Sequence, residues 1–60
     1  MDEFELYDRV KVISCYSQPN YVGERGTVTG FGKDIIHTKL DKYGRAWFYE
    51  FELKMISRGD

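Results

Sequence analysis

The sequence predicts an all-β fold, namely a five-stranded and strongly bent small barrel. Three observations favour it: apolar and polar residues alternate with the period of a strand, turn-forming residues separate the alternating runs, and no stretch has helical periodicity. A chain of 60 residues provides one domain with one small core. Near-closure of a barrel removes the exposed strand edges that two flat sheets of this size would present.

The first strand is expected over Tyr7–Ser14, where Val10 and Val12 lie on one face and the intervening residues on the other. Residues 15–26 contain proline, asparagine and glycine, which favour turns, so this segment is predicted to be a long irregular loop. A loop of this length in so small a domain is usually functional or packed against the core.

The second strand is expected over Gly26–Phe31, with Val28 facing inward. Gly30 and Gly32 flank Phe31, which indicates a bend or a bulge followed by a turn at residues 32–34. The third strand is expected over residues 35–41. Its predicted inward side chains are Ile36, Thr38 and Leu40.

Residues 41–44 are predicted to form a tight hairpin, because aspartate opens such turns and Gly44 can adopt the positive φ that closes them. The fourth strand is expected over residues 45–49, a 3₁₀ turn over 50–52 and a brief last strand over 53–56. The single domain spans residues 1–60, with an N-terminal arm at 1–6 and a polar tail at 57–60. The arm is expected to lie extended across an open end of the barrel, anchored by Phe4 and Leu6.

Several single residues carry expectations of their own. The core is expected to hold Phe4, Phe31, Phe48 and Phe51. Gly23 and Gly26 are expected to supply positive φ where the long loop enters the second strand. Cys15 is expected to be a small buried residue, and His37 a solvated one. Glu50 and Glu52 are expected near the surface, without a pocket that would perturb them.

Composition excludes several classes of function. Nine Lys and Arg residues against ten Asp and Glu residues give a net charge of −1, which disfavours a general nucleic-acid binder. One cysteine and one histidine cannot supply a disulfide or a four-ligand zinc site, so neither metal nor cofactor is expected. The chain has neither a membrane-span pattern nor a signal-peptide pattern, and a reducing cytoplasm is the expected setting. A core of this size can hardly enclose a catalytic cavity, so an enzyme is not expected.

Four stretches carry a resemblance to a known family. They are DRVKVI, VGERGTVTGF, KLDKYG and FYEFELKMI, and together they cover most of Tyr7–Ile56. This order of features resembles the SH3-like barrels of bacterial and phage accessory proteins, of a small peripheral photosystem subunit and of KOW domains. The resemblance implies a 3₁₀ turn before the last strand, and it implies a fold more than a function. Proline-rich peptide binding of the SH3 type is not expected, because the early pair of tryptophans is absent.

Aromatic residues make up 17% of the chain, more than one small core can hide. Tryptophan and tyrosine dominate protein-binding hot spots. The first hypothesis is therefore a non-enzymatic protein-binding module, similar to short phage or prophage accessory proteins that bind and modulate a host protein in the host cytoplasm. The predicted partner-binding residues are Tyr16, Tyr21, Tyr43, Trp47 and Tyr49. The alternative is that these side chains pack under the long loop and the N-terminal arm.

Two further functions remain open. One is a KOW-like module that binds nucleic acid or a ribonucleoprotein, although the net charge disfavours it. Its predicted contact residues are Arg9, Lys11, Arg25, Lys33, Lys39 and Arg45. The other is a structural subunit whose barrel edge completes a larger assembly by strand addition.

Overall fold

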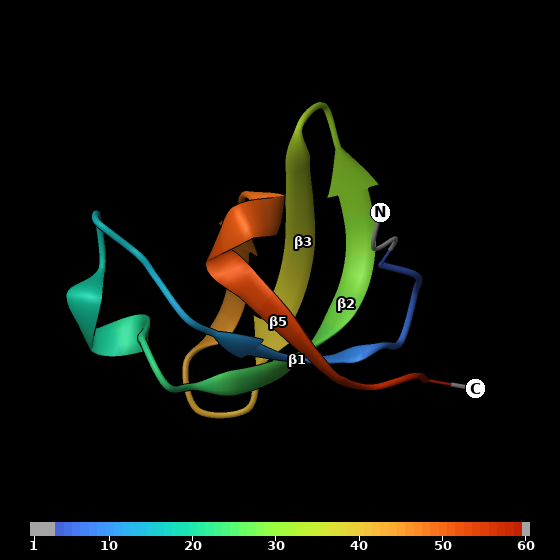
Figure 1. The fold of residues 1–60 in the computed structure, drawn as a ribbon, viewed down its shortest axis with the longest axis horizontal. Coiled ribbons are helices and arrows are strands. Elements are labelled where there is room, and N and C mark those ends of the chain that lie inside the picture. The colour runs from blue at the N-terminus through green and yellow to red at the C-terminus, as the bar shows by residue number, and fades with distance from the viewer. Residues whose placement is uncertain (1–3, 60) are drawn as a thin grey trace.

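The computed structural model describes residues 4–59, which form one antiparallel sheet of five strands and two short 3₁₀ turns. The strands are β1 (Arg9–Val12), β2 (Arg25–Gly32), β3 (Ile35–Leu40), β4 (Gly44–Phe48) and β5 (Leu53–Ser57), and the turns are η1 (Pro19–Tyr21) and η2 (Glu50–Glu52). The order across the sheet is β4-β3-β2-β1-β5, so β4 and β5 are its two edges. The prediction of an all-β fold with five strands is confirmed (Figure 1).

β2 joins the two halves of the sheet. Its first residues pair with β1, and from Gly26 onward it pairs with β3 as far as Gly32. In Figure 1 the two strands β2 and β3 rise together, while the long β1–β2 loop projects to one side and the segment after β5 to the other. Within the described part of the chain, no helix is long and apolar enough to cross a membrane.

The predicted alternation accounts for the core. The buried apolar side chains are Val10, Val12, Cys15, Val28, Ile36, Leu40, Phe48 and Leu53. Thr38 is buried among them, and its hydroxyl donates a hydrogen bond of 3.0 Å to the carbonyl oxygen of Ala46 on the neighbouring strand. Cys15 is 9% exposed, which confirms its prediction as a small buried residue.

Phe31 is not in the core, contrary to its prediction. The predicted irregularity is present as a register shift between Val28 and Gly30, and it places Phe31 opposite the inward-facing Ile36. Phe31 therefore lies on the core side of the sheet, because one extra residue in a strand reverses which face the following side chains occupy. It sits near the tip of the β2–β3 hairpin, beyond the packed core, and remains 52% exposed.

The prediction for η2 was correct in position and wrong in orientation. Phe51 was expected in the core and is 71% exposed, whereas Glu52 was expected near the surface and is 8% exposed. The carboxylate of Glu52 accepts a hydrogen bond of 2.8 Å from the backbone N–H of Tyr49, and this bond satisfies the buried oxygen. Because the turn spans only three residues, orienting Glu52 inward turns Phe51 outward.

Two glycines adopt the left-handed backbone region. Gly44 closes the β3–β4 hairpin at φ +81°, as predicted, and Gly23 has φ +94°. Gly26 was predicted to need a positive φ as well, and it does not have one. Glycine is needed at position 26 because two strands approach closely there: a Cβ at Gly26 would lie 2.7 Å from the carbonyl oxygen of Lys39.

The N-terminal segment is held by a buried carboxylate. Asp8 is fully buried, and it accepts hydrogen bonds from the backbone N–H groups of Glu5 at 2.8 Å and Gly59 at 3.0 Å. Phe4 packs against the core as predicted, but Leu6 is 45% exposed and is not an anchor. The chain turns at residues 6–7, and the part of the predicted arm at residues 1–3 lies outside the described residues.

Candidate functional site

A hollow of about 500 Å³ lies between the β1–β2 loop, β4 and η2. Four of the five aromatic residues predicted to bind a partner line it, and Phe51 completes the lining aromatics on the surface. We call this hollow the aromatic groove, defined by Tyr16, Tyr21, Trp47, Tyr49 and Phe51.

Alternation along β4 and the turn after it positions one wall of the groove. Because Phe48 faces the core, Trp47 on the opposite face of the strand stays 54% exposed. Its ring meets that of Tyr49 edge to face, with 5.6 Å between centroids. Tyr49 in turn stacks on Phe51 at 5.7 Å with the ring planes 3° from parallel. Three aromatic rings therefore form one continuous surface.

The β1–β2 loop supplies the opposite wall, through two residues of different character. Tyr21 packs against the core, with its ring centroid 6.2 Å from that of Phe48 and 4.9 Å from that of Tyr43. The alternative prediction, that these aromatic side chains pack within the fold, therefore holds for the half-buried side chain of Tyr21. Tyr16 is 97% exposed. Tyr43, the fifth predicted residue, contacts Tyr21 but does not line the groove.

The chemistry available in the groove is that of an apolar binding surface with one cation. Arg45 lines it beside the aromatic rings, while the carboxylate of Glu52 is already engaged by the Tyr49 N–H. Cys15 also contributes to the lining as a buried thiol. Within residues 4–59, no three side chains of the kind that ligate metals are grouped closely enough to hold an ion.

Strand pairing brings most of the predicted basic residues onto adjacent positions. Lys11 lies opposite Arg25 on one side and opposite Lys54 on the other, and Lys39 lies opposite Arg45. These residues alternate with the buried ones, so they share the outward face of the sheet. We call them the basic face, defined by Lys11, Arg25, Lys39, Arg45 and Lys54. Lys33 belongs to the β2–β3 turn and is separate.

Arg9, the remaining residue of that predicted set, is engaged by an acid. Its guanidinium donates two hydrogen bonds to the carboxylate of Asp41, at 3.0 and 2.7 Å, and a third at 2.9 Å to Thr27. These hydrogen bonds and the attraction of Arg9 lower the pKa of Asp41, and Asp41 raises the pKa of Arg9. The pair ties β1 to the β3–β4 turn.

Two features of the site were missed by sequence reasoning. Phe51 is predicted to lie in the core, although its place between two glutamates is a signal of exposure. Lys54 was omitted from the basic residues, although it alternates with the buried Leu53 and so must face outward. His37 is exposed as predicted, opposite Trp47.

The chain was compared with family models, curated proteins and solved structures, and none of them matches it.

Proposed function

We propose that this chain is a non-enzymatic protein-binding module that receives an extended segment of a partner protein in the aromatic groove. The single observation that carries the proposal is the convergence of Tyr16, Trp47 and Tyr49 from a loop, a strand and a turn onto one hollow. Large, rigid aromatic side chains with a polar tip are the residues on which protein interfaces most depend.

The position of the groove supports an extended ligand. It lies along β4, which is an edge strand of the sheet, and an edge strand offers backbone N–H and C=O groups to an added strand. A segment placed there would set alternate side chains against Trp47 and Tyr16, while Arg45 offers a partner for a carboxylate.

We also propose that the sheet belongs to an SH3-like barrel. Support comes from the strand order β4-β3-β2-β1-β5, the long β1–β2 loop and the 3₁₀ turn directly before β5. On the same resemblance we propose a phage or prophage accessory protein that modulates a host protein in the host cytoplasm. The genes that surround the coding sequence test this origin: phage genes are expected there, and a setting without any phage gene would oppose it.

Peptides selected from a random library for binding to the chain would test the protein-binding function. The affinity of the selected peptides is then measured by calorimetry for Trp47→Ala, Tyr16→Ala and the control Ile13→Ala, which removes an exposed apolar side chain outside the groove. The two groove variants are expected to weaken binding about tenfold or more, and the control to leave it unchanged. Equal affinities for all three variants, or no peptide selected at all, would contradict the proposal.

The basic face favours a second candidate function, binding of nucleic acid. Cross-strand placement of Lys11, Arg25 and Lys54 gives a row of cations that could follow a phosphate backbone. Binding of a single-stranded oligonucleotide would be measured from about 50 to about 500 mM salt, where phosphate contacts predict a steep loss of affinity. Substituting Lys11→Gln should reduce the salt slope by about one. Undetectable binding at the lowest salt would remove this candidate.

A further inference from the structure

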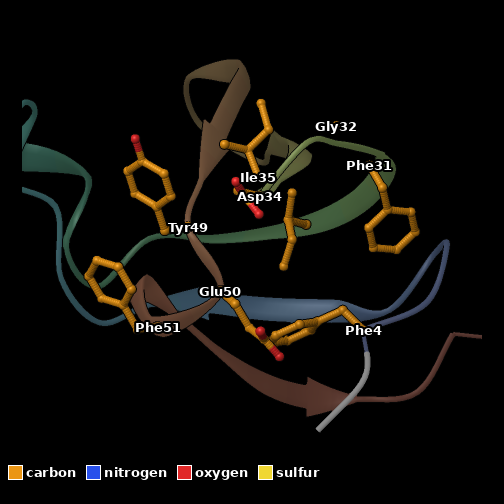
Figure 2. Close-up of a pocket in the computed structure, with 9 residues that line it drawn as sticks. Phe4, Phe31, Gly32, Asp34, Ile35, Tyr49, Glu50 and Phe51 are labelled. Carbon is orange, nitrogen blue, oxygen red and sulfur yellow. The ribbon is translucent and has the colours of Figure 1, made fainter.

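A second hollow, of about 510 Å³, lies on the other side of the Tyr49 and Phe51 rings. Residues of the β2–β3 turn, η2 and the N-terminal segment border it. Figure 2 shows its side chains in two rows, with Phe51, Glu50 and Phe4 along one border and Tyr49, Ile35, Asp34 and Phe31 along the other. We call it the acidic aromatic pocket, defined by Phe4, Phe31, Asp34, Tyr49, Glu50 and Phe51.

The pocket combines aromatic rings with carboxylates, and both of these groups attract a cation. Aromatic rings border it at both ends, and ring faces attract positive charge through their quadrupole. Among the described residues that line it, the charged ones are Asp34 and Glu50, from separate elements, and none is basic. A cation is attracted both by the ring faces and by these two exposed carboxylates, whereas an anion would be repelled by the carboxylates.

One of the two acidic residues of the pocket has an uncommon backbone conformation. Asp34 has φ +65°, in the left-handed region where aspartate and asparagine are among the few tolerated side chains. Glu50 begins η2, directly after Tyr49. Both acidic residues therefore lie in short turns, and within residues 4–59 neither carboxylate forms an ion pair.

We propose that the acidic aromatic pocket binds an arginine side chain of the partner protein. A planar guanidinium stacks on aromatic faces and donates several hydrogen bonds in one plane, so it satisfies rings and carboxylates together. The proposal rests on the proposed protein-binding function, because Tyr49 and Phe51 line both the groove and the pocket. One extended segment crossing these two rings would place its arginine beyond the groove.

The test titrates the isotopically labelled chain, followed by NMR, with two blocked tripeptides that differ in one group. The first is acetyl-Gly-Arg-Gly-amide, and the second carries citrulline, which keeps the shape of arginine and lacks its charge. The arginine peptide is expected to shift the amide signals of residues 31–35 and 49–51, with an affinity at least about fivefold above that of citrulline.

Matched variants assign the effect to the pocket. The double variant Asp34→Asn and Glu50→Gln keeps side-chain size, and asparagine suits the positive φ, so the fold should persist in the same NMR spectra. It is expected to bind the arginine peptide no better than the citrulline peptide. Glu24→Gln removes one negative charge outside the pocket and should leave the preference for arginine unchanged.

The outcomes separate this inference from the function on which it rests. Equal binding of arginine and citrulline, signal changes confined to other surfaces, or an arginine preference that survives the double variant would each overturn the arginine pocket. A lysine tripeptide that binds as tightly as arginine would overturn the choice of a guanidinium. The proposed function fails separately, if no library peptide binds or if Trp47→Ala leaves peptide affinity unchanged. Trp47 does not line this pocket.

Discussion

Phe48 and Phe51 are three residues apart, and their different burial predicts unequal contributions to stability. Phe48 is 1% exposed, so nearly all of a phenyl side chain of about 200 Å² is covered, and its loss corresponds to about 5 kcal/mol at about 25 cal/mol per Å². Phe51 is 71% exposed and covers only about 60 Å², which corresponds to about 1.5 kcal/mol. Replacement by alanine should therefore cost about three times more at Phe48.

Urea unfolding, followed by tryptophan fluorescence, measures this difference. A chain of 60 residues has about 3–9 kcal/mol of stability, so Phe48→Ala is expected to leave little or no folded protein. Phe48→Leu keeps the comparison measurable, with an expected loss of about 1–1.5 kcal/mol, against a smaller loss for Phe51→Leu. Equal midpoints for the two leucine variants, or a lower midpoint for Phe51→Leu, would refute the assignment of Phe48 to the core and of Phe51 to the surface.

Two other features of the fold have measurable consequences. Gly26→Ala should destabilise the chain by about 1–3 kcal/mol in the same urea assay, because its Cβ would meet backbone atoms of β3, whereas Gly30→Ala, which has space, should cost less; equal losses would contradict the close approach. The Gly59 N–H, then the Glu5 N–H and the charge of Arg58, lower the pKa of Asp8 from its ordinary value of 3.8. A carboxyl group whose pKa is lowered by folding adds stability above its ordinary pKa, and this stability is lost as the pH falls through the lowered pKa. Asp8→Asn should therefore destabilise the chain at neutral pH and less so at about pH 2. A stability difference that is the same at both pH values would contradict this role of Asp8.

Sequence reasoning succeeded where a structural feature depends on neighbours along the chain. Alternation alone places Val10, Val12 and Leu40 inward, and the glycine at the β3–β4 turn has the positive φ that its position demands. It failed at Phe31 because a side chain on the core side of the sheet can still lie beyond the packed core, here near the tip of the β2–β3 hairpin. It failed at Phe51 because the orientation of a single 3₁₀ turn depends on which residue finds a partner inside, and here that residue is Glu52.

The candidate site also has features that follow from local sequence and features that depend on the whole fold. The exposure of Tyr16 and Trp47 follows from loop composition and strand alternation, both of which are local. The acidic aromatic pocket joins Phe4, Phe31 and Glu50, which are far apart in the sequence, and only the way the sheet bends brings them to one hollow. A pocket assembled from three separate elements leaves no periodic signal in any of them.

The difference between what the sequence indicates and what the fold arranges is largest for charge. A net charge of −1 suggests a surface without electrostatic preference, and it disfavoured a polyanion as partner. The fold separates the charges that this sum combines, because Lys11 and Lys54 occupy outward positions on paired strands, whereas Asp34 and Glu50 occupy turns. One face is therefore basic and one pocket acidic on a nearly neutral chain. Association with a partner through either surface should weaken with added salt, although the net charge predicts no such dependence.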